Sequence, residues 1–182
     1  MKGIIMNMLA EMVEDQLGLQ EWNDVLLHAN LDGVYTSSGL YHDSEMLKLV
    51  SIISERNNIP ADDLVFAFGQ FMLPGLVQRY PYLIEPMPDF LSFLESIDDV
   101  IHVEVKKLHP GAITPVFSHK RLAPHQLLLN YRSSRKMCQL AEGLISGAAK
   151  HFDTQYDLQH NPCLHTGADH CGFLITVNAA AS

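Results

Sequence analysis

The stretch Tyr131-Arg132-Ser133-Ser134-Arg135 decides how this chain is interpreted. Its side chains Tyr131, Ser133 and Arg135 occupy alternate positions, so an extended backbone would point all three the same way. Arg135 offers a planar fork of donors that fits a carboxylate, and the two hydroxyl groups each add a donor. The pattern predicts a clamp for a ligand that carries two negative charges.

A histidine, His102, lies upstream of this clamp in the apolar stretch 100–105. Haem has two propionates on one edge, which suits the predicted clamp, and its iron needs an axial donor, for which histidine is the usual residue. Taken alone, His102 is more often a buried neutral imidazole bonded to backbone, and the clamp an ordinary polar strand end. Together, the two features indicate a haem site.

The pairing of these features resembles the H-NOX family, the haem domains related to those of soluble guanylate cyclases. The family's Tyr-x-Ser-x-Arg motif matches Tyr131, Ser133 and Arg135, and its proximal histidine matches His102. Further matches are the opening of the chain and two single residues: 1–5, Pro115 and Gly143. The resemblance implies haem b as cofactor, with His102 on the iron and the clamp on the propionates.

Apolar spacing in the first two-thirds of the chain predicts helices. The predicted helices cover residues 4–18, 21–29, from 44 onward, 62–80 and 89–98, with Ser44 and Asp89 as caps and a break or kink at Pro74-Gly75. The last third predicts strands at 114–119, 126–131, 154–160 and 171–177, with a helix from 135 to 151. Gly143 and Gly147 lie one helical turn apart, which would allow another backbone or a flat ligand to approach closely.

These elements predict one α+β domain over residues 1–182, with an N-terminal helical lobe packed on a C-terminal lobe that carries a four-stranded antiparallel sheet. The resemblance implies that haem lies between the lobes. A net charge of −9 argues against nucleic-acid binding. No apolar run reaches the roughly 18 residues of a membrane span, and three cysteines cannot form a closed disulfide framework. We therefore expect a cytoplasmic, reduced protein.

Leucine at position 140 bears on the choice of gas. Family members that hold dioxygen place a tyrosine in the helix after the clamp, and Leu140 stands at that position without a donor. Leu140 could equally be ordinary core packing. The other residues implied to lie near the haem are apolar: Ile5, Leu9, Leu76, Pro115 and Leu144. This pocket predicts nitric oxide and carbon monoxide as ligands in preference to dioxygen.

A second site is indicated by Cys138, His160, Cys163 and Cys171. Three thiolates and one imidazole make a four-ligand set suited to zinc, and some bacterial H-NOX proteins carry such a site. Three unrelated thiols remain an alternative because the spacing is not that of a zinc finger. His151, His165 and His170 are rival imidazoles.

The resemblance implies a haem-based nitric oxide sensor that is not an enzyme. Nitric oxide at ferrous haem would release His102, and the signal would pass to a separate histidine kinase or cyclic-di-GMP enzyme. Two alternatives stay open: a dioxygen-binding haem sensor, which Leu140 disfavours, and a zinc–thiol redox switch in which haem is secondary.

Overall fold

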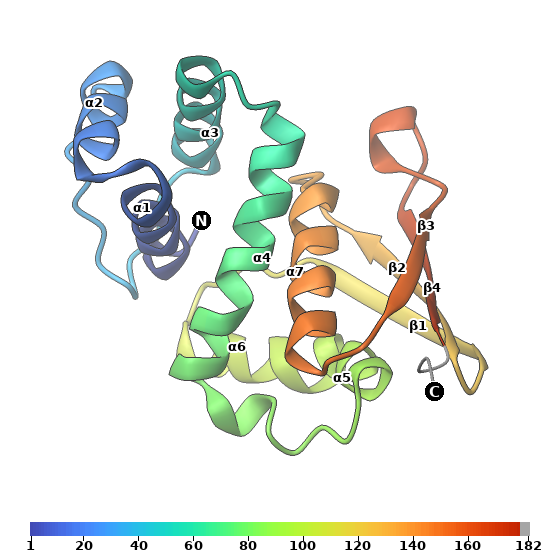
Figure 1. Ribbon diagram of the computed structural model, residues 1–182. Helices are drawn as coiled ribbons and strands as arrows, with labels where there is room; N and C mark the ends of the chain where they lie inside the picture. Colours follow the sequence, from blue (N-terminus) through green and yellow to red (C-terminus); the bar gives the residue numbers. More distant parts are fainter. Residues whose placement is uncertain (179–182) are drawn as a thin grey trace.

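The computed structural model describes residues 1–178 and begins with a group of helices, drawn from blue to green in Figure 1. These are α1 (Gly3–Leu17), α2 (Leu19–Ala29), α3 (Asp43–Asn57) and α4 (Ala61–Arg79). The helices α2 and α3 end at Asn30 and Asn58, which adopt the left-handed conformation that asparagine tolerates. Within the described chain, no helix is both long enough and apolar enough to cross a membrane.

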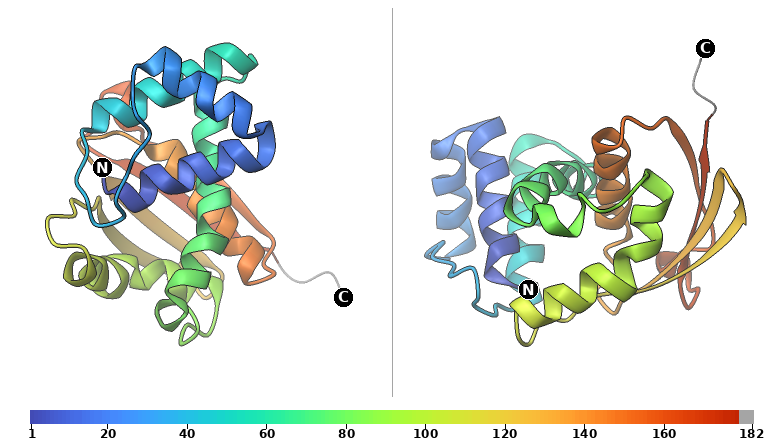
Figure 2. Two further views of the ribbon diagram at one scale, coloured as in Figure 1. Left: turned by 90° about the vertical axis from the view of Figure 1, so that its left-hand side faces the viewer. Right: turned by 90° about the horizontal axis from the view of Figure 1, so that it is seen from below.

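The second group of elements combines short helices with a sheet. After the 3-10 turn η1 (Pro81–Leu83), the chain forms α5 (Phe90–Ser96), the π-helical turn η2 (Ile97–Ile101) and α6 (His102–Leu108). The strands β1 (Val116–Ala123) and β2 (Gln126–Arg132) lead to α7 (Cys138–His151), followed by β3 (Tyr156–His160), the turn η3 (Leu164–Thr166) and β4 (Cys171–Val177). Seen from below in the right-hand view of Figure 2, the helical segment of α5, η2 and α6 spans the space between the sheet and the helical group, with α5 at the sheet end and α6 at the end near the N-terminus.

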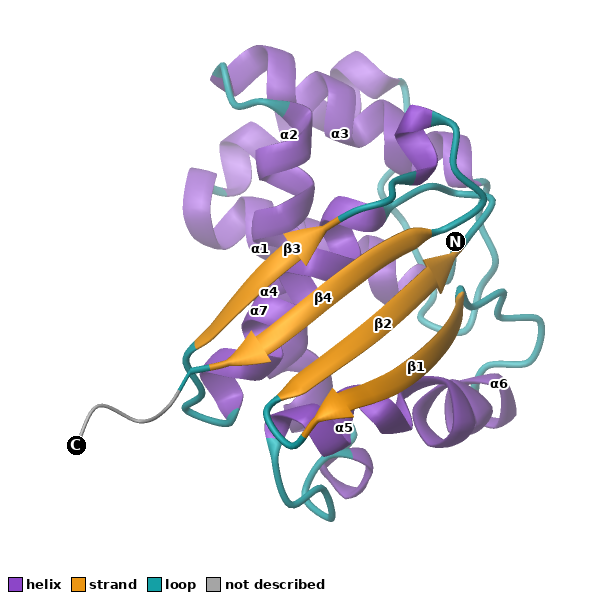
Figure 3. Cartoon of the chain, turned by 90° about the vertical axis from the view of Figure 1, so that its right-hand side faces the viewer, coloured by secondary structure: helices purple, strands orange, loops and turns teal. Residues whose placement is uncertain are grey.

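The sheet has the strand order β1-β2-β4-β3, and every neighbouring pair is antiparallel. Side chains of β2 alternate, so that Leu127, Leu129 and Tyr131 are buried on the face that packs against the helices. Figure 3 looks at the opposite face, with the helices behind it. This arrangement confirms the predicted α+β class with helices first and an antiparallel sheet after them.

Helices α4 and α7 pack closely against each other, between α1–α3 and the sheet (Figure 1). A Cβ atom on Gly143 of α7 would lie 2.1 Å from the carbonyl oxygen of Phe66 in α4, and one on Gly69 would lie 2.5 Å from that of Leu140. Glycine is therefore required where the two backbones meet. The close approach predicted at Gly143 is an approach by another helix.

Some element boundaries differ from the prediction. Asp89 caps α5 as predicted, because its carboxylate accepts from the Ser92 N–H at 2.8 Å. Ser44 is not a cap, since α3 begins at Asp43 and His42 precedes it. Pro74 does not end its helix: α4 continues to Arg79, and the burial of its neighbours in the core outweighs the one lost hydrogen bond.

Candidate functional site

A cavity of about 530 Å³ lies between the helical group and the sheet-bearing group, a size typical of small-molecule sites. Its wall is mostly apolar and combines residues from α1, α4, α5, α6, β2 and α7. Nearly all the residues expected around the haem line it: His102, Tyr131, Ser133, Arg135, Ile5, Leu76, Pro115, Leu140 and Leu144. Leu9 does not; it is fully buried in the core of the helical group.

His102 is the first residue of α6 and directly follows the π-helical turn. Its Nδ1 lies 3.1 Å from Oδ1 of Asp98, one turn earlier, and the same oxygen accepts from the Phe117 N–H of β1 at 3.2 Å. Burial lowers the pKa of His102, and the hydrogen bond with Asp98 offsets only part of that effect. A neutral imidazole held by a carboxylate through one nitrogen keeps the other nitrogen available as a metal ligand.

The predicted clamp has a different backbone from the one expected. Strand β2 ends at Arg132, and a turn follows in which the Lys136 N–H donates to the Ser133 carbonyl at 3.2 Å. Ser133 and Arg135 therefore do not continue the extended strand: residues 134 and 135 form the turn, and Lys136 after it has φ 51°, in the left-handed region. All three clamp residues nevertheless line the cavity.

Contacts fix the Tyr131 and Arg135 side chains of the clamp in place. The Tyr131 hydroxyl accepts from the Met137 N–H at 3.1 Å. Burial raises the pKa of this phenol, so it remains a proton donor. The Arg135 guanidinium donates from Nε to Oδ2 of Asp43 at 2.7 Å and from Nη1 to the Ile113 carbonyl at 2.6 Å. A guanidinium has five N–H donors, so these contacts from Nε and Nη1 orient the group and leave the Nη2 donors for a propionate.

The donor set of the cavity fits haem. Two buried polar atoms on its wall have no hydrogen-bond partner among the described residues, His109 Nδ1 and Thr114 Oγ1. Orphaned buried groups are costly, so they favour a ligand with polar atoms. The remaining wall offers an imidazole, the clamp and a large apolar surface. This combination matches a flat apolar ring with two carboxylates and a metal centre.

Sequence reasoning missed several residues of this site. The cavity wall also includes Ile97 and Ile101 of the π-helical turn, Val105 of α6 and Phe117 of β1. Asp98, which holds His102, is four residues before it, and helical spacing could have revealed that pair. Asp43 could not have been found in this way because 92 residues separate it from Arg135.

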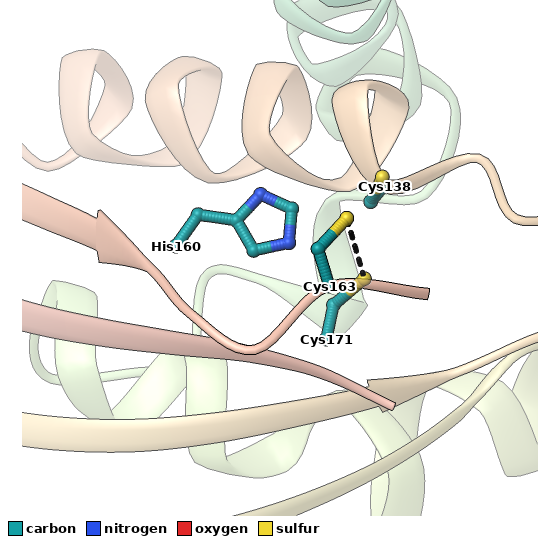
Figure 4. Close-up of side chains that lie close together, drawn as sticks. All are labelled: Cys138, His160, Cys163 and Cys171. Atoms are coloured by element: carbon teal, nitrogen blue, oxygen red, sulfur yellow. Dashed lines mark hydrogen bonds between the residues drawn. The ribbon is translucent and has the colours of Figure 1, made fainter. Parts of the chain in front are cut away.

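The four residues of the second predicted site come from four segments and gather beside the start of α7 (Figure 4). Cys138 begins α7, His160 ends β3, Cys163 lies in the following loop and Cys171 begins β4. Their ligand atoms all lie within 4.8 Å of one another, with the sulfur atoms of Cys163 and Cys171 3.9 Å apart. We call these four residues the thiol–imidazole cluster.

Geometry separates His160 from its rivals. His165 Nε2 is occupied by the Lys136 carbonyl at 2.7 Å, His170 pairs with its neighbour Asp169, and His151 packs edge-on against Phe152. Figure 4 shows the His160 ring pointing toward the sulfur atoms. Burial raises the pKa of the Cys138 and Cys171 thiols, and the neighbouring Cys163 sulfur adds to the effect on both. A cation among them would favour the thiolates instead.

The comparisons with known proteins agree with this geometry. The family model described as haem-NO-binding (HNOB) matches residues 2–160. An H-NOX protein from Shewanella oneidensis, solved in the Fe(II)NO ligation state, is 41% identical, with a TM-score of 0.94 over 98% of this chain and 100% of that one. The unliganded Fe(II) H-NOX protein from K. algicida is 32% identical, with a TM-score of 0.92 over 100% of this chain and 99% of that one.

Among curated proteins, soluble guanylate cyclase gcy-35 of Caenorhabditis elegans is 27% identical over 192 residues, which cover 97% of this chain. The chain spans only 27% of the length of that relative. The matched residues include His102 and the whole of the clamp. The chain therefore belongs to the haem-NO-binding family and has the fold of the H-NOX domains, which bind haem.

Proposed function

We propose that this chain is a haem-based nitric oxide sensor that forms a single domain and has no catalytic activity of its own. The observation that carries the proposal is the cavity, which has a neutral imidazole, a clamp for two carboxylates and a mostly apolar wall. The Shewanella oneidensis relative has been solved in both Fe(II)NO and Fe(II)CO ligation states. The three free cysteines suit a reduced, cytoplasmic setting.

In this proposal His102 binds the iron of haem b, while Tyr131, Ser133 and Arg135 donate to its propionates. Haem, when bound, supplies an iron centre that takes diatomic gases on the side opposite His102. Asp98 holds the imidazole in one orientation through Nδ1. A variant with glycine in place of His102 should bind haem only when imidazole is added. An unchanged five-coordinate histidine spectrum in His102→Gly would remove this assignment.

Apolar side chains support the selection among gases. Ile5, Leu76, Leu140 and Leu144 line the cavity, and none of them can donate a hydrogen bond. Dioxygen on ferrous iron gains partial negative charge and is stabilised by a donor, whereas nitric oxide needs one much less. The wall therefore favours nitric oxide and carbon monoxide, and it disfavours the alternative of a dioxygen sensor.

Release of His102 is the proposed signal. The residue begins α6, and contacts at both ends tie this helix to its neighbours. Asp98 bridges His102 to Phe117 of β1, and Tyr80, which follows α4, bonds to Nε2 of His109, which follows α6, at 3.0 Å. Nitric oxide weakens the bond opposite to it, so His102 would leave and α6 could shift relative to both neighbours. Such a shift gives two states whose balance the gas controls.

We expect the reorganised surface to act on a separate protein, a histidine kinase or a cyclic-di-GMP enzyme. The test compares nitric oxide with carbon monoxide on the activity of that partner while the absorption spectrum is recorded. Nitric oxide alone should change the activity, because carbon monoxide leaves His102 bound. Equal regulation by both gases would show that bond rupture is not the switch.

A second proposal is that the thiol–imidazole cluster binds zinc. Its four ligand atoms lie within 4.8 Å of one another, the number and kind that tetrahedral zinc takes. Protein purified under reducing conditions should contain about one zinc per chain, and oxidation should release it. Loss of signalling on oxidation alone, with no response to gas, would favour the alternative of a redox switch with haem secondary. Absence of zinc in metal analysis would remove the proposal.

A further inference from the structure

We propose that Glu142 is the positioning residue of the thiol–imidazole cluster, and that it holds His160 so that Nε2 faces the three sulfur atoms. The inference rests on the proposed zinc site and adds a residue that touches no ligand atom of the metal. Glu142 lies on α7 four residues after Cys138, so one face of this helix carries both a sulfur ligand and the group that orients the imidazole ligand.

The contact between Glu142 and His160 is direct. His160 Nδ1 lies 2.7 Å from Glu142 Oε1, and both side chains are largely buried, with exposures of 17% and 24%. A neutral imidazole carries its proton on only one nitrogen. The carboxylate places that proton on Nδ1, which leaves the lone pair on Nε2 for a metal.

The other ring nitrogen distinguishes a metal ligand from a simple ion pair. His160 Nε2 is buried and has no hydrogen-bond partner among the described residues. If His160 were a protonated partner of Glu142, Nε2 would bear a buried hydrogen with no acceptor, which is unfavourable. A lone pair directed at a cation removes that cost. The orphaned atom therefore favours the neutral tautomer that Glu142 selects.

Packing fixes the remaining freedom of the ring. The centroids of His160 and the buried Phe173 ring are 4.7 Å apart, with the planes inclined by 55°. The carboxylate holds one ring edge and Phe173 restricts rotation of the ring. Together they leave Nε2 aimed at the space between Cys138, Cys163 and Cys171 (Figure 4).

The test measures zinc affinity of the full chain by competition with a chromophoric chelator. Glu142→Ala should weaken zinc binding by about 10- to 100-fold, as loss of an orienting carboxylate does in other metal sites. Glu142→Gln keeps an acceptor oxygen at the same place, so its zinc affinity should fall less than that of Glu142→Ala. Asp157→Asn is the matched control, because it removes a carboxylate from an exposed position on β3, the strand that carries His160, and should leave the affinity unchanged.

A second readout reports on the imidazole itself. Cobalt(II) bound at the cluster of the parent protein should give the ligand-field bands of three sulfur atoms and one nitrogen, and Glu142→Ala should shift these bands as His160 detaches. If Glu142→Ala fails to fold, Glu142→Leu decides, because leucine fills a similar volume and has no acceptor: parental zinc affinity and an unshifted cobalt spectrum in that variant would overturn the positioning role.

The outcomes separate this inference from the zinc proposal. Zinc bound by the parent protein and equally well by Glu142→Ala would overturn the role of Glu142 alone. A parent protein that binds no zinc in the chelator assay would overturn the zinc site, and the role of Glu142 would fall with it. An equal loss in Asp157→Asn would show that the effect is one of overall charge and not of His160 orientation.

Discussion

The Arg135 guanidinium donates to Oδ2 of Asp43 at 2.7 Å, which joins the turn after β2 to the first residue of α3. Burial alone would raise the pKa of Asp43, but hydrogen bonds from Arg135 and from the Met1 amine lower it below its ordinary value. The carboxylate is therefore ionised at neutral pH and holds Arg135 at the cavity edge. A haem propionate would meet a guanidinium that is already oriented.

Arg135 should contribute more to haem retention than Ser133. A hydrogen bond with charged partners is worth about 1.5–3 kcal/mol and a neutral one about 0.5–1.5 kcal/mol. Arg135→Gln should therefore speed haem loss by about 10- to 150-fold, and Ser133→Ala by about 2- to 10-fold. Transfer of haem to excess apomyoglobin measures both rates. Arg132→Gln is the matched control, because Arg132 lies between the clamp residues Tyr131 and Ser133 and its side chain is exposed. Equally fast haem loss from that variant would contradict the clamp.

Gly143→Ala should destabilise the packing of α7 on α4. The added methyl group would lie 2.1 Å from the Phe66 carbonyl oxygen, and a backbone atom cannot yield as a side chain can. Overpacking of this kind costs about 1–3 kcal/mol. Gly75→Ala is the control: its methyl group meets only the flexible ends of Met8 and Arg79, and alanine favours the helix by about 1 kcal/mol. Urea unfolding followed by circular dichroism should give Gly75→Ala a higher free energy of unfolding than Gly143→Ala. The reverse order would contradict the clash with the Phe66 carbonyl as the cause.

The ion pair between Glu95 of α5 and Arg121 of β1 should make stability depend on pH. Nε and Nη2 of Arg121 donate to the two carboxylate oxygens at 2.8 and 2.7 Å. The hydrogen bond from Arg121 lowers the pKa of Glu95 in the folded state. The stabilisation is thus complete above the unfolded pKa of about 4.3 and is lost as the pH falls through the lower folded value.

Comparison with Glu95→Gln isolates this contribution. The parent protein should be more stable by about 1 kcal/mol or less at pH 7, and the difference in unfolding free energy should shrink as the pH falls below about 4. Chemical denaturation at a series of pH values measures it. In a protein that already carries Arg121→Gln, Glu95→Gln should not change the free energy of unfolding at any of these pH values. A difference that persists there would have to come from another neighbour.

Local sequence signals predicted most of the fold and part of the polar cavity wall. Helical and strand spacing indicated the elements, and the motif pointed to Tyr131 and Arg135 on the cavity wall. The turn after Arg132 could not be read from spacing, because alternation of side chains predicts a strand whether or not the chain turns. The contact of Arg135 with Asp43 depends on how the two groups of elements pack, and no local pattern encodes that.

The apolar residues were harder to assign for a similar reason. Leu9 and Ile5 lie on the same helix one turn apart, yet Ile5 lines the cavity and Leu9 is buried in the helical core. Both positions satisfy the same apolar period, so periodicity cannot separate a ligand wall from a core.

Leu140→Tyr should slow the loss of dioxygen from the ferrous protein. Leu140 lines the cavity on α7, and a tyrosine there would bring a hydroxyl donor to a part of the wall that Leu76 and Leu144 also line. Absorption spectra in air and dioxygen dissociation measured by stopped flow test the change. Leu140→Phe supplies the ring without the hydroxyl and should behave as the parent protein does. Equal behaviour of the two variants would mean that ring volume, and not hydrogen bonding, decides gas retention.

Asp98→Asn should weaken the bond between His102 and the iron. The Asp98 carboxylate accepts from His102 Nδ1 at 3.1 Å and from the Phe117 N–H at 3.2 Å, so it both orients the imidazole and ties it to β1. A carboxylate partner makes an imidazole a stronger ligand, and a neutral amide does so less. The iron–histidine stretching frequency in resonance Raman spectra of the ferrous protein should fall, and nitric oxide should release His102 faster in stopped flow. Asp99→Asn changes the adjacent exposed carboxylate and should leave both measurements as they are in the parent. A stretching frequency in Asp98→Asn equal to that of the parent would show that Asp98 does not tune His102, and would leave its bond to Phe117 as its only role.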